Sequence, residues 1–212
     1  VFNGFSLSYS NIFMSKFSFY MAHGAGLGHS GGFLDRFAVT FCRTKKMNYL
    51  PLTFEYMAQI ESTGKRRPPT RFLQLVDEYK SKLEMDAKKA SIIVAGKSMG
   101  GRVAAQLSSD ERVAGIVCLG FPFYQQGKPE KHRLAFLENI EKPCLIIQGT
   151  RDALGKQVWV EQQSLHPNIK LHWFDGADHD FNVLKSAAKS QSQVMDEINQ
   201  IIHDWVKNDL SV

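Results

Sequence analysis

The sequence has few cysteines, no long hydrophobic run and no block of like charges. Three cysteines in 212 residues (Cys42, Cys118 and Cys144) do not make the disulfide framework of a small secreted protein, so we expect free thiols in a reducing compartment. The longest apolar run, near residues 114–123, is broken by Gly and Pro. It falls short of the roughly 20 residues that a membrane-spanning helix needs. We therefore expect no membrane association.

The charged residues are scattered along the chain and form no long block of one sign. The formal net charge is +5, and the densest basic cluster is only Lys65-Arg66-Arg67 with Arg71 close by. Because nucleic-acid binding usually needs a basic stripe or arm, we expect no nucleic-acid partner. The segment 1–20 lacks the basic start of a signal peptide and is interpreted as strand, which favours a cytoplasmic protein. A composition of 43% hydrophobic and 22% charged residues excludes a disordered chain.

Short apolar runs alternate with amphipathic stretches along the chain. Strands are expected at residues 5–10, 17–22, 48–55, 91–95, 112–119, 143–148 and 169–174. Helices are expected at residues 32–44, 70–85 (capped by Thr70), 98–107, 134–140, 157–165 and 191–207. Buried strands that alternate with helices indicate a parallel sheet covered on both faces. The sequence therefore predicts an α/β fold, a three-layer α/β/α sandwich with a mostly parallel, doubly wound sheet, formed by residues 1–212 as one domain.

Ser98 stands in the pattern G-x-S-x-G (Gly96-Lys97-Ser98-Met99-Gly100), between a predicted buried strand and a predicted helix. This is the context of a nucleophile elbow, where glycines allow strand and helix to approach the strained serine. A glycine-rich turn without chemistry is the alternative. A P-loop nucleotide site is excluded, because the glycine it needs at position 91 is Ser91.

A nucleophilic serine needs a base, and the base needs an orienting acid. Asp152 and His179 each follow the end of a predicted strand, in the order Ser, Asp, His that α/β-hydrolases use. Ligands of such sheets bind at the carboxyl ends of the strands, so the three side chains are expected to meet there. Asp178 and Asp180 are rival acids beside His179, and Asp152 has the alternative role of capping the next helix.

The turn His23-Gly24-Ala25-Gly26 follows another predicted strand and lies where α/β-hydrolases place an oxyanion donor. We expect the backbone N–H groups of Ala25 and Met99 to form the oxyanion hole and His23 to brace the loop. The alternative is a tight turn with no catalytic role.

Four motifs in series, HGAG (23–26), GKSMGG (96–101), GTRD (149–152) and DHD (178–180), resemble the α/β-hydrolase superfamily. The segments TFEYM, GKRRPP, CLGFPF and LIIQGTRD extend the similarity from about Phe17 onward. The sequence is most similar to the small, capless, dienelactone-hydrolase-like branch, related to hydrolase-like domains of a nonspecific-lethal chromatin-complex subunit and a testis-expressed protein. The resemblance implies Ser98 as nucleophile, Asp152 as acid and His179 as base. Dienelactone hydrolases proper use Cys, so Ser98 departs from that activity.

The segment between the strands ending near Gly120 and starting at Pro143 has room for one short helix but not for a lid, so we expect an open site without a cap. Phe121 and Phe123 follow a strand end and are expected to wall the substrate pocket. Ordinary core packing of these two rings is the alternative.

Three cations lie near the expected site in sequence. Arg66 and Arg67 belong to a loop that follows a predicted strand and could attract an anionic substrate, although a solvated loop is the simpler interpretation. Lys97, directly before Ser98, is expected to be exposed.

Together these features predict a serine hydrolase that cleaves a small-molecule carboxylic ester or thioester, without metal or cofactor. Peptide hydrolysis would use the same groups. Because a fold alone does not establish function, an interaction module that retains the hydrolase scaffold is the alternative. The sequence leaves the substrate and the oligomeric state open.

Overall fold

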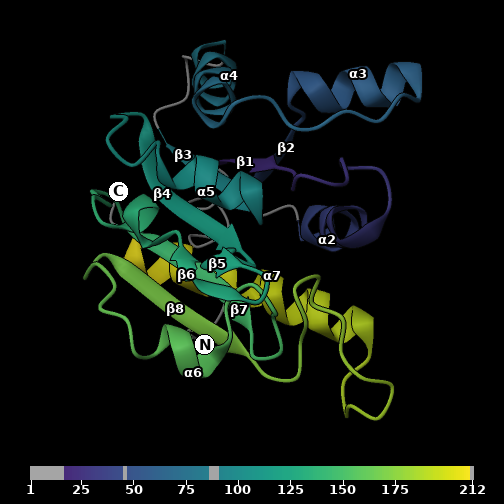
Figure 1. The fold of residues 1–212 in the computed structure, drawn as a ribbon, viewed down its shortest axis with the longest axis vertical. Helices are drawn as coiled ribbons and strands as arrows, with labels where there is room; N and C mark the ends of the chain where they lie inside the picture. Colours follow the sequence, from purple (N-terminus) through teal and green to yellow (C-terminus); the bar gives the residue numbers. More distant parts are fainter. Residues whose placement is uncertain (1–16, 45–46, 86–90, 211–212) are drawn as a thin grey trace, which may run out of the picture.

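A six-stranded parallel sheet organises the computed structural model, which describes residues 17–44, 47–85 and 91–210 (Figure 1). Every neighbouring pair in this sheet is parallel. The strands, in spatial order, are β2 (Asn48–Leu52), β1 (Ser18–Ala22), β3 (Ile92–Lys97), β4 (Val113–Leu119), β7 (Cys144–Gly149) and β8 (Ile169–Phe174). Because parallel strands end at the same edge of the sheet, the loops that follow them are brought together.

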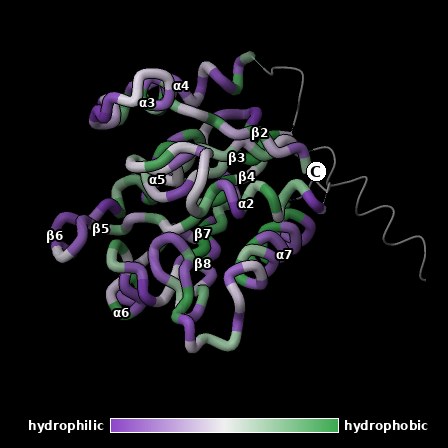
Figure 2. The backbone as a smooth tube through the Cα atoms, turned by 90° about the vertical axis from the view of Figure 1, so that its right-hand side faces the viewer, coloured by the Kyte–Doolittle hydropathy of each residue, from purple (hydrophilic) through white to green (hydrophobic). Residues whose placement is uncertain are grey.

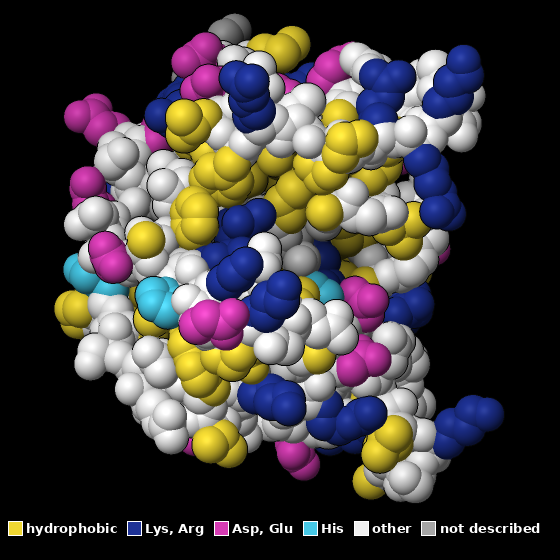
Figure 3. All heavy atoms as spheres, viewed as in Figure 1, with side chains coloured by type: hydrophobic (Ala, Val, Ile, Leu, Met, Phe, Trp, Pro, Cys, Tyr) yellow, Lys and Arg dark blue, Asp and Glu magenta, His cyan; other side chains and the backbone are white. Residues whose placement is uncertain are grey.

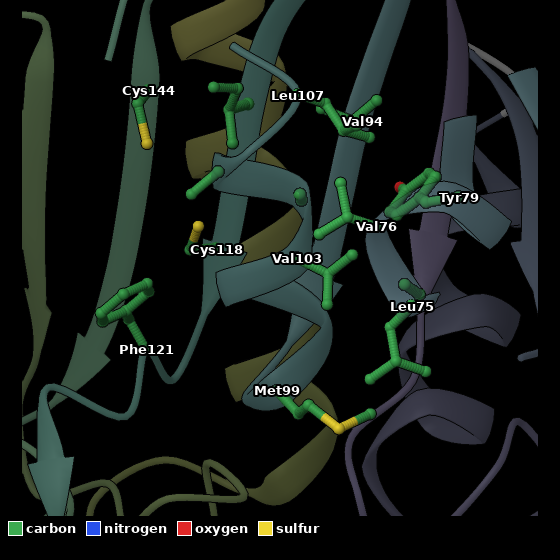
Figure 4. Packing of buried hydrophobic residues seen from close by; sticks show 14 of the residues in the cluster. Leu75, Val76, Tyr79, Val94, Met99, Val103, Leu107, Cys118, Phe121 and Cys144 are labelled. Carbon is green, nitrogen blue, oxygen red and sulfur yellow. The ribbon is translucent and has the colours of Figure 1, made fainter. Parts of the chain in front are cut away.

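Helices cover both faces of the sheet, which explains why its central strands are buried and mostly apolar. Strands β1, β3 and β7 are buried at every position. Alternate residues of each strand enter opposite cores, as the period of two along a strand requires. In β3, for example, Val94 packs with helices α4 (Phe72–Glu84) and α5 (Met99–Ala105), whereas Ile93 packs with α2 (Gly32–Arg43) and α7 (Gln191–Asp209). Figure 4 shows part of the first core, with Val94, Val103 and Cys118 between strands and helices. The predicted three-layer sandwich is confirmed.

Helix α3 (Glu55–Thr63) was not predicted from the sequence, which suggested a strand to residue 55 followed by a loop. Strand β2 ends at Leu52, and the next helix buries Tyr56 and Met57. It ends at Gly64, whose φ of 68° places it in the left-handed region that favours glycine after a helix. Gly64, predicted from the sequence to lie in a loop, is therefore the C-cap of α3.

The segment between β4 and β7 contains no inserted domain. It forms a hairpin of β5 (Tyr124–Gln125) and β6 (Lys128–His132), followed by a single 3₁₀ turn, η1 (Leu134–Leu137). The hairpin was not predicted because β6 is exposed at every position and lacks apolar alternation, as its hydrophilic colour in Figure 2 shows. The expected absence of a cap agrees with this arrangement.

Other boundaries differ slightly from the predicted ones. Helix α6 (Gln157–Val160) is shorter than expected, and the predicted cap of α4 is wrong because Arg71, not Thr70, occupies the N-cap position. Helix α7 begins with a capping box formed by Ser190 and Gln193, which satisfies backbone groups at the helix start. The strand predicted at 5–10 lies outside the described residues. None of the helices that the structure describes has the length and hydropathy that crossing a bilayer requires.

Candidate active site

The three predicted catalytic residues lie at the carboxyl edge of the sheet. Ser98 directly follows β3, Asp152 follows β7, and His179 follows β8. The turn after β1 lies at the same edge, because β1 and β3 pair in register up to Ala22 and Gly96. Strand order thus assembles residues that are far apart in the sequence.

Ser98 has a strained backbone between β3 and α5. Its φ of 53° and ψ of −113° lie in a region that costs a non-glycine residue about 1–3 kcal/mol. Two backbone hydrogen bonds stabilise this strained conformation of Ser98. The Ser98 N–H donates to the Leu119 carbonyl at 3.0 Å, and the Ser98 carbonyl accepts from the Gly101 N–H at 3.0 Å. This turn presents the serine side chain above the sheet edge, as the sequence pattern predicts for a nucleophile elbow.

The glycines around Ser98 are required by close backbone contacts. A Cβ at Gly96 would overlap the backbone carbonyl carbon of Gly100, and a Cβ at Gly100 would lie 2.6 Å from the Ala22 carbonyl oxygen. Real Cβ atoms do not approach backbone this closely, so the start of α5 could not pack against β1 and β3 with larger residues here.

Gly100→Ala is therefore expected to destabilise the fold by roughly 3 kcal/mol, the upper range for overpacking a core. Urea unfolding followed by circular dichroism measures the change. Gly26→Ala is the matched control, because a Cβ at Gly26 meets nothing within 4 Å. Equal stability of the two variants would show that the close approach at Gly100 does not constrain the elbow.

A chain of hydrogen bonds joins the side chains of Ser98, His179 and Asp152. His179 Nε2 lies 2.9 Å from Ser98 Oγ, and His179 Nδ1 lies 2.7 Å from Asp152 Oδ2. Because an ionised carboxylate only accepts, the tautomer that satisfies both contacts carries its proton on Nδ1 and accepts the Ser98 hydroxyl at Nε2. In this arrangement the imidazole is oriented to take the serine proton.

Asp152 is fully buried but not isolated. Besides His179, its Oδ2 accepts from Gln148 Nε2 at 2.8 Å, and its Oδ1 accepts from the Leu154 N–H at 2.8 Å. These three donors offset the cost of burying a carboxylate. Gln148 was not identified from the sequence, because it lies within strand β7, where a polar residue has no motif to mark it.

The two rival acids have other partners. Asp178 Oδ1 accepts from the backbone N–H groups of Asp180 and Asn182, each at 2.9 Å, and so closes its own loop. Asp180 forms an ion pair with Lys97 at 3.1 Å. Of these three acids, Asp152 is the one that the structure brings to the His179 ring.

The turn at 23–26 packs directly against the elbow. A Cβ at Gly24 would lie 3.7 Å from Ser98 Cβ, and Tyr56 of α3 donates its hydroxyl to the Ala25 carbonyl at 3.1 Å. The buried His23 accepts the Phe54 N–H at Nε2 (3.1 Å), and burial lowers the pKa of His23 to about 4. A neutral His23 thus braces the loop. Met99 opens α5, where N–H groups lack helical acceptors, so Ala25 and Met99 stay the predicted oxyanion donors.

A cavity of about 500 Å³ opens beside Ser98 and His179. Both apolar and charged side chains line it: Leu27, Phe33, Leu34, Arg36, Lys97 and Asp180. Figure 3 shows a hollow on this face where a histidine lies among acidic and basic side chains. Among residues 17–44, 47–85 and 91–210, no group of three or more His, Cys, Asp or Glu is arranged to hold a metal ion.

The predicted pocket residues lie elsewhere than expected. Phe121 and Phe123 are fully buried in the core beneath α5 and do not line the cavity, in agreement with core packing (Figure 4 shows Phe121). Arg66 and Arg67 are exposed and do not line it either; Arg67 donates to the Gln59 side chain. The prediction that Lys97 is exposed is wrong, since Lys97 is only 5% exposed.

Comparison with known proteins agrees with the fold. The chain matches the alpha/beta hydrolase domain family over residues 15–207 and belongs to that family. An esterase of Pyrococcus furiosus is 20% identical (TM-score 0.63, covering 93% of this chain and 83% of that one). A thermophilic esterase of Thermogutta terrifontis is 12% identical (TM-score 0.63, 92% and 91%). An alpha-beta serine hydrolase homologue of Coxiella burnetii is 16% identical (TM-score 0.57, 88% and 84%). These three similarities concern the fold.

Proposed function

We propose that the protein is a serine hydrolase that cleaves a small carboxylic ester or thioester through an acyl-enzyme. The observation that carries this proposal is the hydrogen-bonded chain from Ser98 through His179 to the buried Asp152, at the edge of a cavity. Membership of the α/β-hydrolase family and the esterases of similar fold support the same reaction class.

The proposed reaction has two halves. Ser98 Oγ attacks the substrate carbonyl carbon while His179 Nε2 takes its proton, and Asp152 stabilises the imidazolium that forms. The Ala25 and Met99 N–H groups donate to the tetrahedral oxyanion. When the intermediate collapses, the alcohol or thiol leaves with the proton from His179. Water, activated in the same way, then attacks the acyl carbon and releases the acid and free Ser98.

The size of the cavity favours a small substrate. A volume of about 500 Å³ lies within the range of small-molecule sites, roughly 300–1,000 Å³. The apolar side chains of Leu27, Phe33 and Leu34 suit an acyl chain or an ester alcohol, while Arg36 suits a polar group. The absence of an inserted cap between β4 and β7 leaves the cavity without a lid from that segment.

Treatment with a fluorophosphonate probe tests this function. A serine hydrolase is expected to be labelled at neutral pH and to lose p-nitrophenyl butyrate hydrolysis in proportion to the label. Heat-denatured protein is the control for nonspecific labelling. A folded protein that neither takes up the probe nor hydrolyses the ester would contradict the proposal and favour the interaction module.

A further inference from the structure

Lys97 is buried, although lysine is almost never fully buried without a partner. It is the last residue of β3 and directly precedes Ser98. Its side chain is 6% exposed, and its Nζ lies 3.1 Å from Asp180 Oδ1 and 5.9 Å from the centre of the Phe33 ring. A solvent-exposed lysine beside the elbow would be hydrated and would not need an acidic partner. The position beside the nucleophile therefore requires a physical explanation.

Gly120, at the end of β4, brings Lys97 and His179 to the same space. With a φ of 62°, its backbone passes so close that an added Cβ would lie 3.4 Å from Lys97 Nζ and 3.4 Å from His179 Nδ1. The two nitrogens are therefore no farther apart than those two distances combined. Asp180 directly follows His179 in the chain. The ion pair consequently joins the strand that precedes Ser98 to the loop that carries the imidazole.

We propose that the Lys97–Asp180 ion pair positions His179 for the reaction, by fastening its loop to the nucleophile strand and by balancing two opposite charges beside the imidazole. The inference rests on the proposed hydrolase function. Lys97 is a positioning residue in this account, because it acts through His179 rather than on the bond that breaks.

Several other charges surround this pair and must be considered in its electrostatics. Burial lowers the pKa of the Lys97 ammonium, and the attraction of Asp180 opposes this effect most strongly. The other charged groups beside the pair are Asp152 in the loop after β7, Asp178 in the loop after β8, and Arg36 of α2, which lines the same cavity. These charged residues are present in every variant of Lys97 or Asp180. A shift of the acidic limb between the variants is therefore attributed to the ion pair.

The two halves of the pair are expected to shift the pH dependence in opposite directions. His179 accepts the Ser98 proton in the proposed reaction, so the charges beside its ring act on the acidic limb of the pH–rate profile. Asp180→Asn removes a negative charge and leaves the Lys97 ammonium, which disfavours the imidazolium and moves the acidic limb to lower pH. Lys97→Met leaves the Asp180 carboxylate and moves that limb to higher pH. Because Asp180 is 60% exposed, solvent screening should limit each shift to roughly 0.5–1 pH unit.

The rate constant of fluorophosphonate labelling, measured from about pH 5 to pH 9, tests this proposal without knowledge of the natural substrate. We expect each single variant to label roughly tenfold more slowly on the plateau, since a small displacement of a catalytic group is costly. The double variant Lys97→Met/Asp180→Asn is expected to return the acidic limb close to its wild-type position. Lys170→Met is the matched control, because Lys170 pairs with Asp209 at the same 3.1 Å but near the amino end of β8.

The outcomes separate the ion pair from the hydrolase function. Acidic limbs that stay in place, or that move in the same direction in both single variants, would overturn the positioning role while labelling of the wild type upholds the hydrolase. An unlabelled wild type would overturn both. Asp180→Asn alters a largely exposed side chain, so this variant is expected to fold. If Lys97→Met does not fold, the acidic limb of Asp180→Asn alone still tests the proposal.

Discussion

Ser98→Ala is expected to lower kcat for p-nitrophenyl butyrate by about 10⁵- to 10⁶-fold, the loss expected when the nucleophile of a catalytic triad is removed. The cavity, the glycine turn and the start of α5 remain, so KM is expected to change little. Steady-state kinetics of the purified variant measures both constants. Urea unfolding should show a fold at least as stable as the wild type, because the substitution removes one hydroxyl and creates no close contact.

Ser108→Ala is the matched control for this substitution. Ser108 is a largely buried serine whose hydroxyl donates to the Asn139 carbonyl at 3.1 Å, and it does not line the cavity. Its kcat should stay within a few-fold of the wild type. If Ser98→Ala retained activity within tenfold of the wild type, Ser98 could not be the nucleophile.

Asp152→Asn is expected to lower kcat by about 10⁴-fold, as loss of the correct histidine tautomer does in a serine triad. The Leu154 N–H fixes an oxygen at the Oδ1 position, so the new NH₂ group replaces Oδ2. That group faces His179 Nδ1, which can then only accept a hydrogen bond. The proton moves to Nε2, where the imidazole can no longer take the Ser98 proton.

Asp178→Asn separates this explanation from the rival acid. An asparagine at 178 keeps an oxygen for the N–H groups of Asp180 and Asn182. We therefore expect kcat within about threefold of the wild type, measured by the same kinetics, since changes at surface loops with retained hydrogen bonds are small. A larger loss of kcat in Asp178→Asn than in Asp152→Asn would show that Asp152 is not the acid that orients His179.

The sequence predicted the sheet well because buried parallel strands are apolar at nearly every position. Strand β3 and strand β7 could be located from such runs alone. Helix α3 could not, since its short amphipathic face buries only Tyr56 and Met57 and follows a strand directly. The hairpin of β5 and β6 has little hydrophobic signal, because β5 has only two residues and every residue of β6 is exposed.

The candidate site was predictable where a residue type suited to catalysis follows the end of a predicted strand. Ser98, Asp152 and His179 each follow the end of a predicted strand, and the structure brings these side chains together. The environment of Lys97 was not predictable, because its partner Asp180 is distant in the sequence. Asp180 belongs to the loop after β8, which reaches the end of β3 although β4 and β7 lie between these two strands. Phe121 and Phe123 were ambiguous for a related reason: a residue after a strand can turn toward the site or, as here, into the core.

Identification of the modified residue is the most direct test of the hydrolase account. The wild-type protein would be treated with the fluorophosphonate, digested, and analysed by tandem mass spectrometry. A single phosphonylated side chain, Ser98, is expected, with label prevented by prior incubation with a slowly deacylating ester. Label on another residue, or equal label in Ser98→Ala, would contradict the hydrolase account.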